Sequence, residues 1–201
     1  MSMEELGLRQ RKKARTRELI IERAMALFDE RGFDHVTIAD IAAAADIAPR
    51  TFFSYFPSKD AVVFHDFDVF FDAFRTQVRE RPAGVSTLDV LRAFVADVVE
   101  GMDPSDPAER CRRRVIDASA TLQQHDREVI GQFERVLADG MADDLGVPRD
   151  SPRARVVAAA AAAALAELER VFDKANPPAD PMAAFDEVFA FVRGGIAALQ
   201  G

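Results

Sequence analysis

The sequence contains almost no cysteine and, apart from phenylalanine, almost no aromatic residues. Its 201 residues include one Cys, one Tyr and no Trp, against 16 Phe. The lone cysteine, Cys111, excludes a disulfide within the chain and a metal cluster held by several thiolates. We therefore expect the protein to work in a reducing compartment, where free thiols persist.

Long apolar runs are also missing. The first thirty residues are charged throughout and lack the apolar core of a secretory signal. The Ala-rich run from Val156 to Leu168 spans only about 13 residues, whereas a membrane-spanning helix needs about 20. The sequence therefore predicts a soluble protein of the cytoplasm, with no membrane partner.

Signatures of catalysis are missing as well. The three histidines, His35, His65 and His125, are scattered, and none lies in a nucleophile or metal-binding motif. His65 and Asp68 have the spacing of two metal ligands on one helix, but no third ligand is apparent. We predict that the chain is not an enzyme and has no metal or other cofactor.

Charge is distributed unevenly along the chain. The net charge is −8, but residues 1–60 contain ten basic and ten acidic residues, so the rest carries the whole deficit. The segment RQRKKARTR, residues 9–17, contains six cations and no acid, among them Lys12, Lys13 and Arg15. A basic arm in front of an acidic body is typical of a nucleic-acid-binding head on a separate regulatory body. A solvated basic tail is the alternative.

Helical periodicity begins directly after this arm. From Ile20, apolar residues recur at i, i+4, i+7 and i+8, on one face of a helix that we expect to start at Thr16 and end at Gly32. Thr37, with Asp40 three residues later, has the spacing of an N-cap with its partner and predicts the start of a short second helix.

A tight turn follows the second helix. Asp46 tolerates the left-handed backbone of such a turn, and Pro49 suits the first turn of a third helix, which we expect to span residues 49–56 and to stop at Pro57. Ser58 then caps a fourth helix. Two short helices joined by a turn of about four residues, behind a longer helix, form the outline of a helix-turn-helix.

The third helix has two different sides. Apolar residues such as Phe52 and Phe56 can anchor one side in a core. The other side projects an unusual set of side chains, namely Pro49, Arg50, Phe53 and Tyr55. In a major groove, an arginine can reach guanine O6 and N7, an aromatic edge can meet a thymine methyl, and a tyrosine hydroxyl can reach a phosphate. The pattern predicts a recognition helix, with simple packing inside the head as the alternative for Thr51 and Phe53.

Residues 16–63, which include LFDERGFDHVTI, IADIAAAADIA and TFFSYFPSKDAV, closely resemble the DNA-binding head of TetR-type transcriptional regulators. The resemblance covers about a quarter of the chain without gaps. It implies DNA contacts by Thr37, Pro49, Arg50, Thr51, Phe53, Tyr55 and Lys59, in addition to Lys12, Lys13 and Arg15 of the arm. Thr37 would meet a phosphate, and Lys59 would meet another together with the N-terminus of the fourth helix.

Three positions depart from the family pattern. Asp46 stands where a glycine is usual, and Phe53 replaces a frequent tyrosine, so Phe53 offers apolar contact in place of a phosphate bond. Ala48 stands where Ser or Thr commonly caps the recognition helix, which weakens that cap by about 0.5 to 2 kcal/mol unless a DNA phosphate satisfies the free amides.

Beyond the head, turn-forming segments separate five further helices, which we place near residues 86–100, 107–122, 126–144, 152–174 and 181–199. The fourth helix carries Phe residues at spacings of three and four from Phe64 to Phe74. Such a stripe is either core or a ligand-binding surface. In the family this helix links head and body, so we assign an apolar ligand site to Phe67, Phe71, Phe74, Phe94 and Phe133.

The last two helices have the pattern of an association surface. The segment VVAAAAAAALAELERVF has few large side chains, and an apolar stripe follows the final helix at Phe185, Val188, Phe189, Val192, Ile196 and Leu199. Two such helices from each of two chains would form a four-helix bundle. A hairpin buried within one chain is the alternative, and the family resemblance favours the homodimer.

Two features near Cys111 leave alternatives open. Its neighbours Arg110 and Arg112 would lower the pKa of the thiol and suit an oxidant sensor, whereas inert packing needs no special environment. The cations of Arg112 to Arg114 either form a solvated helix face or meet an acidic group of a ligand.

The sequence therefore predicts an all-α chain of about nine helices, with a DNA-binding head in residues 1–60 and a ligand-binding and dimerisation body in residues 61–201. We expect a homodimeric transcriptional repressor that binds a palindromic operator in double-stranded DNA and is released by a small, largely apolar effector. The alternative is a DNA-binding structural or nucleoid-associated factor of the same fold that senses no ligand.

Overall fold

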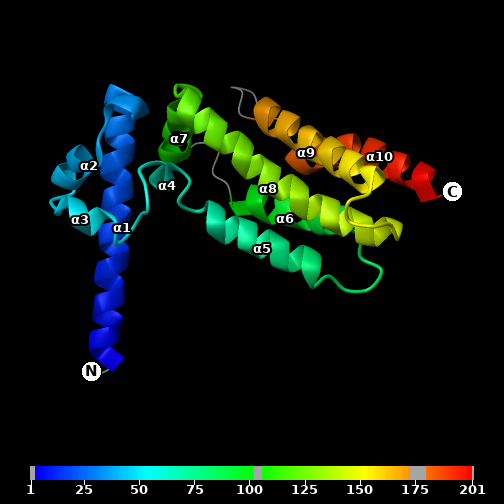
Figure 1. Cartoon of the computed structure of the whole chain (residues 1–201), viewed down its shortest axis with the longest axis horizontal. Helices are drawn as coiled ribbons and strands as arrows, with labels where there is room; N and C mark the ends of the chain where they lie inside the picture. The colour runs from blue at the N-terminus through cyan, green and yellow to red at the C-terminus, as the bar shows by residue number, and fades with distance from the viewer. Residues whose placement is uncertain (1–2, 102–105, 173–179, 201) are drawn as a thin grey trace. The chain divides into compact units, whose positions relative to one another are not determined.

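The computed structural model describes residues 3–101, 106–172 and 180–200. Every regular element in these ranges is a helix (Figure 1), which confirms the all-α prediction. The described residues form ten α-helices and one short 3₁₀ helix, where the sequence predicts about nine helices. The chain divides into two compact units. One contains the chain up to Phe67 and the later segment that ends at Arg127, and the other contains Asp68 to the end of α6 and the chain from Glu128 onward.

Helix α1 (Met3–Arg31) is longer than predicted. It begins 13 residues before Thr16, because the basic arm consists largely of Leu, Glu, Gln, Arg and Lys, which all favour a helix. The predicted end is confirmed: Gly32 has φ 80°, and its N–H donates to the carbonyl of Phe28 at 2.9 Å. The arm is therefore a helical extension of the head.

Three short elements follow α1 and complete the head. They are η1 (Phe33–His35), α2 (Ile38–Ala44) and α3 (Pro49–Phe52). Helix α2 packs against both α1 and α3 (Figure 1). The core of the head consists of Ile20, Ala24, Phe28, Phe33, Ile41, Phe52 and Phe56, all of which are buried.

Helix α3 is shorter than the predicted range of 49–56. After Phe52 the chain continues in hydrogen-bonded turns, in which Ser54 N–H donates to Thr51 and Tyr55 N–H to Phe52. The N–H of Phe56 still donates to the carbonyl of Phe52 at 3.0 Å. Pro57 ends these turns, because it has no N–H to donate and disfavours the α conformation of Phe56.

The predicted fourth helix is in fact two helices, α4 (Asp60–Val63) and α5 (Phe67–Arg79). The backbone leaves the helical region at Phe64, with φ −100° and ψ 31°. Tertiary contacts stabilise the break, because Arg17 donates to the carbonyl of His65 at 2.8 Å and the ring of His65 lies 3.0 Å from the carbonyl of Val62. Carbonyls freed at a helix end need such partners.

Helices α7 (Pro107–Asp117) and α8 (Ala120–Leu145) come later in the chain, and α7 packs against α1. Arg114 donates two hydrogen bonds to the carboxylate of Asp29 across this contact, at 3.2 and 2.9 Å. The compact unit that contains the head therefore includes α7 and the first residues of α8, in contrast to the division that the sequence predicts at residue 60.

The second unit is formed by α5, α6 (Thr87–Gly101), most of α8, α9 (Pro152–Phe172) and α10 (Pro181–Gln200). Helices α9 and α10 lie side by side, and α10 also packs against α6 (Figure 1). At one end of the unit, the half-buried Arg81 binds the carbonyl of Gly140 and the carboxylate of Asp144, which also accepts from the N–H of Thr87. This cluster links the connection between α5 and α6 to α8.

None of the helices in the described ranges combines the length and apolar character that a membrane span requires. Those ranges also contain no group of three or more His, Cys, Asp or Glu side chains that could hold a metal ion.

Candidate nucleic-acid interface

The start of α3 presents polar and aromatic side chains to solvent. Arg50 is exposed, and Phe53, just after the helix, is 56% exposed. Phe52, which lies between them in the sequence, is fully buried. The centres of the Phe52 and Phe53 rings are 5.7 Å apart, in an edge-on arrangement. The predicted split between an anchoring side and a projecting side is therefore present in the structure.

The N-terminus of α3 has no side-chain cap. Ala48 precedes it in an extended conformation and offers no side-chain oxygen, and Pro49 occupies the first turn without an N–H of its own. Thr51 is half-buried, and its N–H donates to the carbonyl of Ala48 at 2.8 Å.

The turn between α2 and α3 has the left-handed backbone that the sequence predicts. Asp46 has φ 53°, and among the described residues it is the only non-glycine residue with a positive φ. The next N–H, of Ile47, donates back to the carbonyl of Ala42 at 2.9 Å and closes the turn. This turn sets the direction in which α3 leaves α2.

A surface groove of about 360 Å³ lies between α1 and the residues that follow α3. It is lined by Lys12, Lys13, Thr16, Ser54 and Tyr55. The two ammonium groups and the hydroxyls of Ser54 and Tyr55 are hydrogen-bond donors that suit phosphate oxygens, whereas the hydroxyl of Thr16 already donates to the carbonyl of Lys12 at 3.0 Å. The structure thus brings the predicted Lys12, Lys13 and Tyr55 together, although they are more than 40 residues apart in the sequence.

Sequence reasoning missed two lining residues, Thr16 and Ser54. Thr16 could have been found from spacing, because residues three and four positions after Lys12 and Lys13 share their helix face. No sequence signal marks Ser54, because its place depends on the turn after α3. Arg15 is exposed on α1 but does not line the groove.

Thr37 caps α2 as predicted. Its hydroxyl accepts from the N–H of Asp40 at 3.2 Å, and the carboxylate of Asp40 accepts from the N–H of Thr37 at 2.8 Å. The hydroxyl also lies 2.5 Å from that carboxylate and donates to it. These bonds to Thr37 lower the pKa of Asp40. The sequence predicts that the hydroxyl of Thr37 meets a DNA phosphate, but in the structure this hydroxyl already donates its proton to Asp40.

Lys59 differs from its expected orientation. Its ammonium donates to the carbonyls of Phe33 and Val36, at 2.8 and 3.1 Å, and lies 4.1 Å from the centre of the Phe33 ring. The lysine is thus turned toward the head, whereas the sequence prediction has it facing a phosphate. Ser58, the predicted cap of the following helix, accepts from the N–H of Ala61 at 3.4 Å.

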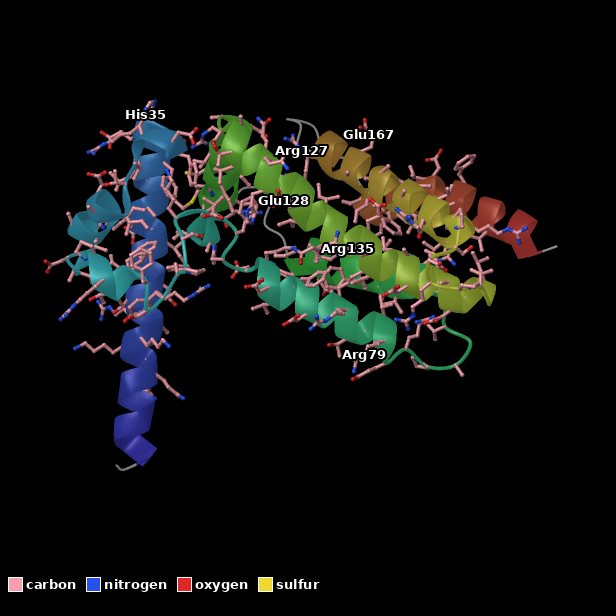
Figure 2. All side chains as sticks on the ribbon, in the orientation of Figure 1. His35, Arg79, Arg127, Glu128, Arg135 and Glu167 are labelled. Carbon is pink, nitrogen blue, oxygen red and sulfur yellow. The ribbon has the colours of Figure 1, made fainter. Side chains whose placement is uncertain are left out.

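Four of the five phenylalanines predicted to bind a ligand come together in the second unit. Phe74 lies 5.0 Å from Phe94 and 5.4 Å from Phe133, and Phe71 lies 5.5 Å from Phe133, between ring centres. Side chains of α5, α6 and α8 fill the space between these helices (Figure 2). Phe67 belongs to the other compact unit. We call Phe71, Phe74, Phe94 and Phe133 the aromatic cluster.

Two of the three arginines predicted to meet an acidic group of a ligand, Arg112 and Arg114, are engaged elsewhere. Arg112 forms two hydrogen bonds with Glu109, at 2.8 and 2.6 Å, and Arg114 pairs with Asp29. Both residues lie in the compact unit of the head, whereas the aromatic cluster lies in the other unit. Their charges are neutralised locally, so they do not support the predicted contact with an acidic ligand group.

Cys111 does not have the environment of an oxidant sensor. Burial, with the carboxylate of Asp29 as a further cause, raises the pKa of the thiol. The sulfur lies 3.9 Å from the carbonyl of Met25. A thiol that stays protonated reacts slowly, so the structure favours the inert-packing alternative.

The apolar stripe of α10 is divided between two faces. Phe185 and Phe189 are buried and stacked at 4.0 Å, and Val192 is buried beside α9 in the core of the unit. Val188 is partly exposed, and Phe191, which the predicted stripe omits, is 85% exposed. Leu199 lies outside the residues whose side chains are described. The stripe therefore closes a hairpin within the chain and leaves an outer apolar face.

Comparisons with known proteins agree with this architecture. A family model described as "Bacterial regulatory proteins, tetR family" matches residues 20–65, and one described as "MftR C-terminal domain" matches residues 85–197. The chain is 33% identical over 151 residues to the HTH-type transcriptional regulator TcmR of Streptomyces glaucescens, an alignment that covers 69% of this chain and 66% of TcmR, just under two thirds. It is 30% identical over 141 residues to MftR of Mycobacterium tuberculosis, described as a mycofactocin biosynthesis transcriptional regulator, covering 67% of this chain and 71% of MftR.

Solved structures share the fold. SmeT superposes with a TM-score of 0.64 at 21% identity, covering 88% of this chain and 90% of SmeT. FadR of Thermus thermophilus superposes with a TM-score of 0.59 at 23% identity, covering 89% and 94% of the two chains. The two family models, one of which spans more than half of the chain, and the identity to MftR show that the chain belongs to the TetR family of bacterial transcriptional regulators.

Proposed function

We propose that the chain is a homodimeric transcriptional repressor that binds a palindromic operator and is released by a small, largely apolar ligand. The observation that carries the proposal is the exposed start of α3, with Arg50 and Phe53, directly followed in sequence by the Ser54 and Tyr55 that line the cationic groove. The start of α3 thus offers side chains for base edges, and the turn that follows α3 offers hydrogen-bond donors for phosphates.

The contacts divide by chemistry. Arg50 is assigned to a guanine edge, where a guanidinium can donate two parallel bonds. Phe53, which has no donor, is assigned to a thymine methyl. The groove donors Lys12, Lys13 and Tyr55 are assigned to the DNA backbone, where they set register and affinity for any sequence.

Dimerisation is assigned to the outer face of α9 and α10. Val156 on α9 is 67% exposed, and Phe191 on α10 is 85% exposed. Contiguous exposed apolar patches mark association surfaces, and we assign these two residues to one such patch. Two copies of this helix pair would form a four-helix bundle and hold two α3 helices at a fixed separation.

The ligand is assigned to the aromatic cluster. Phe74 is buried in the core of the unit, and Phe71, Phe94 and Phe133 around it are half-buried, so the cluster offers an apolar environment to a ligand. Among proteins with this fold, SmeT is known as a complex with triclosan and the Thermus FadR as a complex with lauroyl-CoA. Helix α8 contributes Phe133 to this cluster and His125 to a contact with Phe64, where the rings stack at 4.5 Å. A shift of α8 on ligand binding would therefore disturb the contact with Phe64.

The test of the function is selection of DNA bound by the full chain from a random duplex pool. We expect a palindrome whose half-site centres lie about one helical turn apart, roughly 34 to 36 Å, because both α3 helices must enter the major groove on one side of the DNA. Recovery of bound DNA without any preferred sequence would contradict the proposal and support the ligand-independent structural factor.

The ligand assignment has a separate test. An effector that couples to DNA release by about 1 to 3 kcal/mol lowers DNA affinity 5- to 150-fold, and linkage requires that it bind the DNA-free protein more tightly than the DNA complex by the same factor. We would screen apolar compounds for this difference with the full chain and with folded Phe71→Ala and Phe74→Ala variants. The assignment fails if no compound shows the difference, or if the two variants respond as the unmodified chain does.

A further inference from the structure

Helices α6 and α10 are joined by four charged side chains that are far apart in the sequence. Arg92 of α6 donates two hydrogen bonds to the carboxylate of Asp186 on α10, from Nε at 2.6 Å and from Nη2 at 2.7 Å. Arg193 of α10 donates to Oδ1 of Asp89 on α6 at 2.9 Å. We call Asp89, Arg92, Asp186 and Arg193 the ion ladder.

The α6 side of the ladder is fixed by the first turn of that helix. Oδ2 of Asp89 accepts from the hydroxyl and from the N–H of Ser86, at 2.6 and 3.1 Å, and the N–H of Asp89 donates back to that hydroxyl at 3.2 Å. Oδ1 is thus left to Arg193. The hydrogen bond from Ser86, together with that from Arg193, lowers the pKa of Asp89, and the hydrogen bond from Arg92 lowers the pKa of Asp186. Both carboxylates are therefore charged at neutral pH.

On α10 the ladder lies away from the outer apolar face. Asp186 and Arg193 are seven residues apart, so they share one side of the helix, about two turns from each other. At about 100° of rotation per residue, Val188 and Phe191 lie about 200° and 140° around the helix from Asp186. The ladder residues therefore leave the proposed dimer interface free of their own side chains.

Apolar packing and the ion ladder restrain α10 in different ways. Phe185, Phe189 and Val192 are buried in the core of the unit, but the attraction between apolar surfaces has no direction. A guanidinium that donates two parallel bonds to a carboxylate has a defined geometry. Exposed ion pairs contribute little when isolated, and networks with bidentate geometry are the exception. Two attachment points about two turns apart therefore restrain the rotation and the tilt of α10 against α6.

We propose that the ion ladder positions the outer face of α10 for dimerisation, so that Asp89 and Arg92 of α6 control the strength of the homodimer without touching the partner chain. A rotation of α10 by one residue step would turn Phe191 by about 100° and remove it from the interface. The inference rests on the proposed function, because it requires that the outer face of α9 and α10 is where two copies meet.

Exchange of the two charges between the helices tests the inference on the full chain. Arg92→Asp places a carboxylate against Asp186, and Asp186→Arg places a guanidinium against Arg92. The double variant restores a pair of opposite charge with the same two types of side chain. The dissociation constant of the dimer is measured by sedimentation equilibrium, and the free energy of unfolding by urea denaturation, at one salt concentration for all proteins.

We expect each single variant to raise the dissociation constant about 2- to 100-fold, the range that coupling between contacting residues covers. The double variant should return most of the way to the unmodified value. Should a reversed single variant not fold, Arg92→Met keeps the stem without the donors and should raise the dissociation constant in the same direction. The matched control is Arg75→Met on α5, which removes a similarly exposed pair with Asp72 in the same unit and should leave the dissociation constant unchanged.

Three results would overturn the inference and leave the homodimer standing. They are a dissociation constant that neither single variant changes, a double variant that dimerises no better than the weaker single variant, and a loss of unfolding free energy with an unchanged dissociation constant, which would show that the ladder only stabilises the single chain. Failure of the proposed function looks different. An unmodified chain that stays monomeric at every concentration would overturn the homodimer and the inference together.

Discussion

Arg50 is the exposed cation at the start of α3. If it donates to a guanine edge, Arg50→Ala should weaken binding to the cognate site by about 1 to 3 kcal/mol and relax preference at one base pair in each half-site. Fluorescence anisotropy with cognate, singly substituted and random duplexes measures both effects.

The control for Arg50 is Arg75→Ala. Arg75 lies on α5 in the other compact unit, where it pairs with Asp72 at 2.9 Å. This variant removes the same charge from outside the head and should leave the cognate preference intact. Equal losses by Arg50→Ala on cognate and random DNA would make Arg50 a phosphate contact.

Asp46 carries the left-handed backbone of the turn, with φ 53°. An L-residue in this region is strained by about 1 to 2 kcal/mol, whereas glycine is not strained but loses more backbone entropy on folding. Asp46→Gly should therefore raise the free energy of unfolding by up to about 1 kcal/mol, as measured by urea denaturation. It also removes a negative charge from the DNA-binding unit and should strengthen DNA binding at low salt.

Asp46→Asn separates these two effects. Asparagine also tolerates the left-handed region, so its stability should stay close to that of the unmodified chain, while DNA binding strengthens as for glycine. A loss of stability in Asp46→Gly would contradict the strain argument.

Two glycines of α8, Gly140 and Gly131, allow the effect of an added Cβ to be compared within one helix. A Cβ on Gly140 would lie 2.5 Å from Thr87 Oγ1 and 2.9 Å from a methyl of Val78, whereas a Cβ on Gly131 would meet only the end of Arg135, at 3.8 Å. Gly140→Ala should lower the free energy of unfolding by about 1 to 3 kcal/mol through overpacking. Gly131→Ala should raise it by up to about 1 kcal/mol, because alanine favours a helix more than glycine.

Urea unfolding of both α8 variants, at equal protein concentration, measures the difference. Equal effects of the two substitutions would show that helix propensity alone governs α8. It would then follow that the contact between Gly140 and Thr87 can relax without cost.

The N-terminal part of α1 is the second element with a testable role. Removal of residues 1–13 deletes Lys12 and Lys13, the two charged residues that line the groove. Affinity should fall by the same factor for cognate and random DNA, and the salt slope should flatten by about 0.9 for each phosphate left without its cation. Filter binding across a salt series gives both quantities. A change of sequence preference with an unchanged salt slope would contradict the assignment of this segment to the DNA backbone.

At the scale of the whole molecule, the homodimer that we propose depends on the outer face of α10. Phe191→Glu places a charge in the centre of the proposed interface and should convert the dimer to a monomer, because an unpaired charge is costly to bury. Light scattering after size-exclusion chromatography measures the mass.

Val69→Glu is the control for Phe191. Val69 is 70% exposed on α5, away from α9 and α10 in the sequence, so this variant should remain a dimer. An unchanged mass for Phe191→Glu would exclude this face as the interface.

Local signals in the sequence determined much of the head. The N-cap at Thr37, the left-handed turn at Asp46 and the end of α1 at Gly32 were all predicted, because each depends on residues within four positions of one another. The exposed side of α3 was predicted for the same reason. The all-α class was also predictable, because apolar periodicity and turn residues mark helices along the whole chain.

Tertiary structure alone decided which polar groups are already bonded and which apolar groups are buried. Lys59 meets carbonyls 23 and 26 residues away, and Arg114 meets Asp29 at a separation of 85 residues. The break after α4 depends on Arg17, 48 residues before His65. Periodicity shows that α10 has an apolar stripe, but only the packing of α9 against it determines that Phe189 is buried and Phe191 exposed. Spacing along the chain encodes faces and caps, whereas a pairing between distant side chains depends on the folded arrangement that brings them together.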